Sequence, residues 1–149
     1  MTKDVLVSIS GLQFDGGETE NPETIESITK AEYYKRNSHH YVVYDEVTEG
    51  SDKVTKNIIK FADGMLSVSK RGLMNVNMIF EENKKNMANY VTPYGNLLIG
   101  IDARVVDMEE MEDRIRVSVQ YGLEINYEHM ADCSLTLDIR ARGEGFTLQ

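Results

Sequence analysis

The chain has 149 residues, of which 41% are hydrophobic and 28% are charged, and its formal net charge is −9. This length and composition predict one globular domain over residues 1–149 and argue against a disordered chain. Because the net negative charge repels phosphate groups, we expect neither nucleic acid nor an anionic membrane as a partner.

The first half of the chain contains short segments in which apolar and polar residues alternate. Val5, Val7 and Ile9 share one side of the first such segment. Turn-forming residues follow one another at about the 8–12-residue spacing of an all-β sandwich or barrel. Asp63-Gly64 predicts a tight hairpin with positive φ at both central positions. The other predicted turns are residues 15–17, 37–38, 49–52, 82–83, 93–95, 108–113 and 128–132.

Residues 21–34 allow two interpretations. Asn21-Pro22-Glu23 is typical of a helix start, with a capping residue, a proline at the first helical position and an acid in the first turn. The following residues, Thr24 to Tyr34, are rich in Thr, Ile and Tyr, which favour strands. We therefore predict a strand.

The second half contains the longest alternating segment. From Ile115 to Tyr127 every second residue is apolar, so one side of the strand is dry and the other wet. A slip of one residue would bury two arginines and a glutamate, which fixes the register. Leu97 to Val105 alternates in the same way. The acidic run Met108 to Asp113 could form one helical turn, but we interpret it as a solvated connector.

These patterns predict the fold class. We expect an all-β protein, an antiparallel meander of roughly eight to ten strands. Closing the meander into a barrel removes the exposed sheet edges, so a barrel is favoured over an open sheet.

The sequence contains no established catalytic or metal-binding motif. Neither HExxH, paired CxxC, GxxxxGK[ST] nor GxSxG occurs. His39 and His40 are adjacent, so on a strand they would face opposite sides and could not easily bind one metal ion together. We expect structural or surface roles for these two histidines and for His129. We predict no cofactor and no metal. An enzyme is disfavoured; that hypothesis would require Arg71 to bind a small anionic substrate beside a carboxyl group of raised pKa.

Cys133, the single cysteine, lies in an apolar stripe, which favours a buried and inert thiol over a reactive one. One cysteine cannot form an intramolecular disulfide. Residues 1–7 lack the apolar run of roughly 7–15 residues that is typical of a secretory signal. Together these features predict a cytoplasmic protein.

Eight tyrosines and eight methionines suggest a binding role. Methionine adapts its shape, and tyrosine combines a flat apolar ring with a polar tip, so both suit a small-molecule cavity. The alternative is a packed core filled by flexible side chains, as in many small barrels. In the binding hypothesis four tyrosines and two methionines line the cavity, and Arg71 binds an anionic group of the ligand. The predicted ligand-binding residues are Tyr44, Arg71, Met74, Met78, Tyr90, Tyr94 and Tyr121.

Several stretches, in this order along the chain, resemble the YwiB-like family of small, uncharacterised bacterial proteins. They are residues 7–13, 33–35, 41–46, 70–72, 78–81, 90–95 and 119–126. The resemblance implies a calycin-like β-barrel and supports a strand over residues 24–34. Calycin-like barrels often hold small apolar molecules such as lipids, pigments or fatty acids, but the family supplies no activity that can be carried over.

The sequence thus leads to a cytoplasmic, lipocalin-like and non-enzymatic β-barrel that binds a small, largely apolar ligand. The alternative is a filled barrel that acts through its surface, as a protein-interaction module or a homodimer. An apolar patch on an outer strand would favour that alternative.

Overall fold

The computed structural model describes residues 3–11, 27–47, 50 and 52–142. Within them, ten antiparallel strands form one sheet. The strands are β1 (Asp4–Ser10), β2 (Ser27–Arg36), β3 (His39–Val47), β4 (Val54–Ala62), β5 (Met65–Arg71), β6 (Val76–Glu81), β7 (Lys84–Thr92), β8 (Gly95–Glu110), β9 (Arg114–Ile125) and β10 (Glu128–Ala141).

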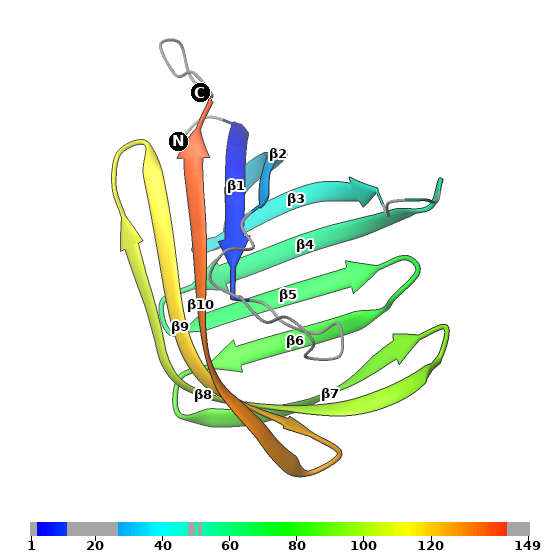
Figure 1. The fold of residues 1–149 in the computed structure, drawn as a ribbon. Coiled ribbons are helices and arrows are strands. Elements are labelled where there is room, and N and C mark those ends of the chain that lie inside the picture. The colour runs from blue at the N-terminus through cyan, green and yellow to red at the C-terminus, as the bar shows by residue number, and fades with distance from the viewer. Residues whose placement is uncertain (1–2, 12–26, 48–49, 51, 143–149) are drawn as a thin grey trace.

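The sheet curls into a nearly closed barrel, as Figure 1 shows. Apart from β6 and β7, which are the two edges of the sheet, each strand pairs with its neighbours in sequence, and β1 pairs with β10, so the first and last strands lie side by side. β6 and β7 are joined by a bridge between Asn75 and Val91, whose backbone groups exchange hydrogen bonds of 2.9 and 2.8 Å. Elsewhere along this seam the Asn86 amide donates to the Ile79 carbonyl oxygen at 3.3 Å. These contacts close the meander predicted from the sequence.

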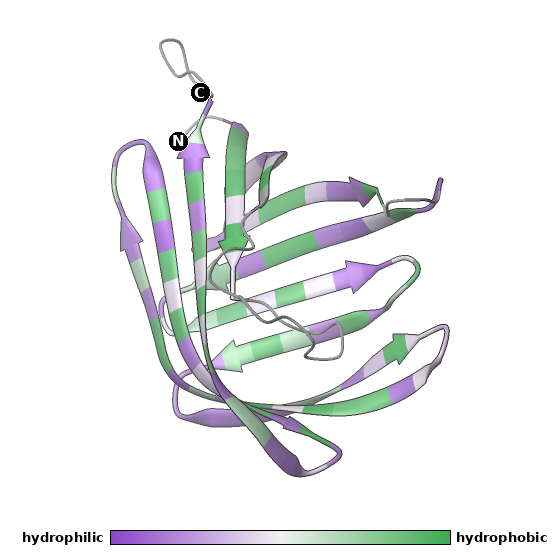
Figure 2. Cartoon of the chain, viewed as in Figure 1, coloured by the Kyte–Doolittle hydropathy of each residue, from purple (hydrophilic) through white to green (hydrophobic). Residues whose placement is uncertain are grey.

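The barrel interior is built from the apolar residues that alternate along the strands. On β9, Ile115, Val117, Val119 and Tyr121 are buried, as the pattern predicts. Figure 2 shows the same alternation as bands of opposite hydropathy along most strands. Across the interior, the rings of Phe80 and Tyr121 meet edge to face with centroids 4.9 Å apart. Burial of these side chains is the main source of stability.

The alternation predicted for β9 continues too far, because the strand ends at Ile125. Asn126 and Tyr127 form the turn, with φ values of 51° and 69°, and Tyr127 is exposed. Positive φ at both central positions matches the twist of a hairpin, so the chain reverses here. The turn predicted at residues 128–132 is therefore wrong, since these residues begin β10.

A bulge corrects the prediction for β8. The register shifts between Ala103 and Val105, so two residues oppose one on β9. As a result Val105 is exposed and Val106 is buried, the reverse of the predicted alternation. β8 also continues to Glu110, so the first part of the predicted connector over residues 108–113 is strand.

Several local predictions are confirmed. Residues 27–34 form a strand, whereas residues 15–17 and 21–26 lie outside the described part of the chain. Asp63-Gly64 forms the expected tight hairpin, with positive φ at Gly64 but not at Asp63. In the described ranges, no helix is both long enough and apolar enough to cross a membrane.

Candidate functional site

Three polar side chains converge on the inner face of the barrel. Glu46, Asn57 and Lys70 lie on β3, β4 and β5, at positions that continue the inward-facing series of their strands. They lie at the end of the barrel that carries the β3–β4, β5–β6 and β7–β8 connections, on the right in Figure 1. We call this the Lys70 end, and the opposite end, with the β2–β3 and β4–β5 turns, the His40 end.

The three side chains form one hydrogen-bonded cluster. The Lys70 ammonium donates to Asn57 Oδ1 at 2.7 Å and to Glu46 Oε1 at 3.3 Å. The Asn57 amide donates to the same glutamate oxygen at 3.3 Å and to the Thr55 carbonyl oxygen at 3.4 Å. Asn57 is fully buried, and these bonds satisfy its amide. The Lys70 side chain is 20% exposed and that of Glu46 53% exposed, so the cluster reaches from the interior to solvent.

A close approach of two strands holds the cluster in place. At Gly72, just past the end of β5, a Cβ atom would lie 2.7 Å from Thr55 Cα and 2.9 Å from the Val54 carbonyl oxygen. Only glycine allows the backbone to pass this close. Gly72 therefore brings the end of β5 against β4, and with it Lys70 against Asn57.

The surroundings of the cluster are largely apolar. Tyr44 pairs with Asn57 in register and is buried, and Val76 pairs with Lys70 and is also buried. Burial raises the pKa of Tyr44 to about 12, and the nearby Glu46 charge adds to the rise. The Tyr44 hydroxyl therefore stays neutral and available as a donor near neutral pH.

The structure brings only part of the predicted ligand site together. Tyr44 lies beside the cluster, while the Tyr90 hydroxyl donates to Met74 Sδ at 3.1 Å at the same end of the barrel. Met78 and Tyr121 lie in the core, where they pack against other strands. Each of these five side chains contacts the interior or its rim.

Two predicted residues lie elsewhere. Arg71 is exposed and faces the outer side of β5, because its neighbour Lys70 takes the inward position. Tyr94 is 99% exposed in the β7–β8 turn. The sequence argument missed Glu46, Asn57 and Lys70, although each is a polar residue at a position where the alternation expects an apolar one. That irregularity was the signal for the site.

A pocket of about 400 Å³ lies where β2 and β3 part beyond the pair Glu32 and Val43, and none of the three cluster residues lines it. Tyr44 lines this pocket as well as the cluster. The other lining side chains are mostly charged and of both signs. The complete lining is Asp4, Lys30, Ala31, Glu32, Val43, Tyr44, Asp45, Lys56 and Arg142.

A second polar group is buried at the His40 end. His40 Nδ1 lies 2.6 Å from the Tyr33 hydroxyl, its ring stacks on Phe61, and its Nε2 lies 3.9 Å from Glu110 Oε1. Burial lowers the pKa of His40, opposed by the Glu110 charge. Burial, with Glu110, raises the pKa of Tyr33. These neutral groups tie β2, β3 and β8 together, in line with the structural role predicted for His40.

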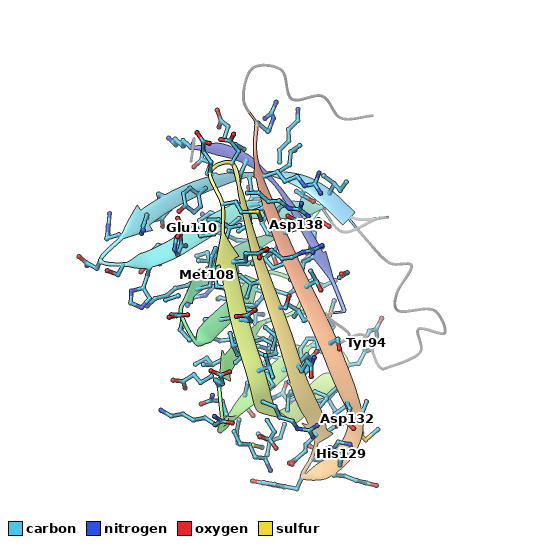
Figure 3. The ribbon with its side chains drawn as sticks, turned by 90° about the vertical axis from the view of Figure 1, so that its left-hand side faces the viewer. Tyr94, Met108, Glu110, His129, Asp132 and Asp138 are labelled. Carbon is cyan, nitrogen blue, oxygen red and sulfur yellow. The ribbon has the colours of Figure 1, made fainter. Side chains whose placement is uncertain are left out.

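The outer face of β8–β10 carries ion pairs. Arg114 holds Asp138 through bonds of 3.0 and 2.7 Å. Partial burial acts to raise the pKa of Asp138, but Arg114 and neighbouring arginines outweigh it and lower that pKa. Figure 3 shows Asp138 toward one end of β10, and His129 and Asp132 together at the other. In the described residues, no three His, Cys, Asp or Glu side chains are grouped to bind a metal ion.

Cys133 is half-buried beside Tyr121 on the inner face. Burial raises the pKa of its thiol, although a hydrogen bond with Tyr121 acts in the opposite direction. The thiol therefore stays protonated near neutral pH, as expected of the inert cysteine predicted from the sequence.

The fold and this interior define the class of protein, a nearly closed antiparallel β-barrel of ten strands in its described part. The chain belongs to the family described as a domain of unknown function, DUF1934, whose model matches residues 7–137. It is similar to the uncharacterized beta-barrel protein YwiB of Bacillus subtilis (strain 168), with 26% identity over 121 residues, covering 79% of this chain and 83% of that protein.

The crystal structure of the ywiB protein from Bacillus subtilis matches with a TM-score of 0.75, at 21% identity, over 95% of this chain and 93% of that chain. This likeness confirms the β-barrel fold predicted from the sequence. The match to the family model confirms the predicted family resemblance.

Proposed function

We propose that this protein is a non-enzymatic, cytoplasmic barrel that binds a small, largely apolar molecule at its Lys70 end. The observation that supports this is the convergence of Glu46, Asn57 and Lys70 at an end of the barrel whose inner surface is otherwise largely apolar. Small-molecule sites typically combine apolar walls with a few converging polar groups that orient the ligand.

The cost of burying these groups supports the same proposal. Placing Asn57 and Lys70 inside a barrel requires their removal from water, and apolar residues of similar size would stabilise the fold about as well. A polar group retained at such a position is therefore better explained by recognition of a ligand than by stability. Tyr44, Met74 and Tyr90 supply aromatic and adaptable apolar surface at the same end.

The first test is to purify the protein gently from its own host and compare its native and denaturing mass spectra. We expect a small-molecule adduct that is present in the native spectrum and lost on denaturation. A clean apo mass at a protein concentration that retains tight ligands, together with no binding of apolar probes, would contradict the proposal.

The location is tested by adding the recovered molecule, or dodecan-1-ol, to isotopically labelled protein. Backbone amide signals of Glu46, Asn57, Lys70 and Tyr90 should shift, whereas those of Tyr33 at the His40 end should not. Equal shifts at both ends would reject the assignment of the site to the Lys70 end.

The surface hypothesis has one observation in its favour. Val47 and Val54 face each other across β3 and β4, and both are exposed on the outer side of the barrel. Size-exclusion chromatography with light scattering tests it directly. A dimer that the double substitution Val47→Lys and Val54→Lys converts to a monomer would favour a self-associating module over a ligand barrel.

A further inference from the structure

We propose that the molecule bound at the Lys70 end carries a carboxylate, which takes the place that Glu46 now occupies. This inference rests on the proposed function and narrows it to amphiphiles with an anionic head. It follows from the geometry of the donors around Glu46 Oε1 and from the different exposure of the three side chains.

Two donors converge on that oxygen. Lys70 Nζ and Asn57 Nδ2 both lie 3.3 Å from Glu46 Oε1. Charge-assisted N–H···O bonds are usually about 2.7–2.9 Å long, so both donors hold the glutamate loosely. In contrast, Lys70 Nζ and Asn57 Oδ1 are 2.7 Å apart, which shows that the donors themselves are firmly positioned.

The exposure of the side chains decides which group can leave. Asn57 is fully buried and Lys70 is 20% exposed, so neither can turn to water without breaking its packing. The Glu46 side chain is 53% exposed and can rotate into solvent. A ligand carboxylate can then accept the two hydrogen bonds that Glu46 releases, and no buried donor loses its partner.

The positive charge of Lys70 determines which ligand head group is favoured. Among the described inward-facing residues of β3, β4 and β5, Lys70 is the one cation. Once Glu46 has moved out, the Lys70 ammonium lacks a counter-ion in partly buried surroundings. An anion at that point is strongly favoured, an alcohol less so, and an ammonium head is repelled. The apolar neighbours Tyr44 and Val76 suit the chain that follows the head.

The experiment compares the binding of dodecanoate, dodecan-1-ol and dodecylammonium by titration calorimetry. We expect the full chain to bind dodecanoate at least tenfold more tightly than the alcohol, since a hydrogen bond to a charged group is worth about that much. Dodecylammonium should bind most weakly.

Two variants separate the roles of the cluster. Lys70→Met should weaken dodecanoate binding about tenfold or more and leave the alcohol nearly unchanged. Glu46→Gln should tighten dodecanoate binding several-fold, because it removes the negative charge of the resident competitor and leaves a weaker acceptor. Each has a control that makes the same charge change away from the cluster and outside the pocket lining, Lys60→Met on the outer side of β4 and Glu82→Gln in the β6–β7 turn, both expected to bind as the unmodified chain does.

Several results would overturn the inference. They are equal binding of acid and alcohol by the unmodified chain, the same loss in Lys70→Met as in Lys60→Met, or weaker acid binding by Glu46→Gln. If Lys70→Met does not fold, Glu46→Gln decides alone, since its side chain is half exposed. Failure of all three amphiphiles to bind would reject the proposed function itself, whereas alcohol binding without acid preference rejects only the carboxylate.

Discussion

Gly72 offers a direct test of how the Lys70 end is held together. In the variant Gly72→Ala, the new Cβ would lie 2.6 Å from Thr55 Oγ1, 2.7 Å from Thr55 Cα and 2.9 Å from the Val54 carbonyl oxygen. Two of these three contacts are to backbone, which cannot rotate away. The end of β5 must therefore move outward from β4.

The magnitude follows from these contacts. Overpacking a tight site costs about 1–3 kcal/mol, and clashes with backbone belong at the upper end of that range. For a domain of this size about 3 kcal/mol lowers the melting temperature by roughly 6–12 °C. Because Lys70 precedes Gly72 by two residues, the same movement should weaken its bond to Asn57 and the binding of dodecanoate.

Thermal unfolding followed by circular dichroism measures the effect, with Gly100→Ala as the control. At Gly100 a Cβ would meet side-chain atoms, Met87 Sδ at 3.1 Å and Glu124 Cβ and Oε1 at 3.2 Å, so a loss of about 1 kcal/mol or less is expected. An unchanged melting temperature for Gly72→Ala would refute the reasoning. So would full rescue by Thr55→Ala, since that change removes only one of the three contacts.

Three further predictions concern stability. Burial lowers the pKa of His40, so on acidification His40 is protonated in the unfolded chain before it is protonated in the folded one, and the free energy of unfolding should fall as the pH drops below about 6.5. His40→Gln, whose side chain can still form a hydrogen bond with Tyr33, should reduce this fall when stability is measured by urea denaturation at several pH values. The pKa of Asp138 is lowered, so its contribution to the free energy of unfolding is present above about pH 4 and is lost on further acidification. Asp138→Asn should remove this loss of stability in acid, and Arg114→Ala should reduce it. Phe80→Ala removes a fully buried ring and should cost about 3–5 kcal/mol in urea unfolding, and a loss below 1 kcal/mol would show that the interior is not packed around it.

The alternation of residues predicted most of the fold. On β9 the side chains of Ile115 and Val117 point inward because successive strand residues face opposite sides, and this requires no knowledge of the partner strands. The Asn37-Ser38 turn follows equally from local chemistry, since both residues favour turns and asparagine tolerates the positive φ observed there. Short-range sterics and the need to bury apolar surface determine such features.

Other features depend on how the strands pair. The bulge that exposes Val105 and buries Val106 arises where β8 adjusts its register to β9, and the local sequence does not signal it. The hydrophobic pattern likewise predicts that Ile125 and Tyr127 lie on one face of the strand. In the structure the strand ends before Tyr127, which is part of the hairpin turn.

The candidate site, too, was predicted only in part from the sequence, and the rest depends on how the strands pair. The sequence supplies aromatic and sulfur-containing residues with strand alternation, and Tyr44 and Met78 are buried as that pattern implies. It does not show that Asn57 and Lys70 meet, because they lie on different strands and come together only through the β4–β5 register. The sequence therefore determined which side of each strand is dry, and the closure of the barrel decided which polar side chains share that interior.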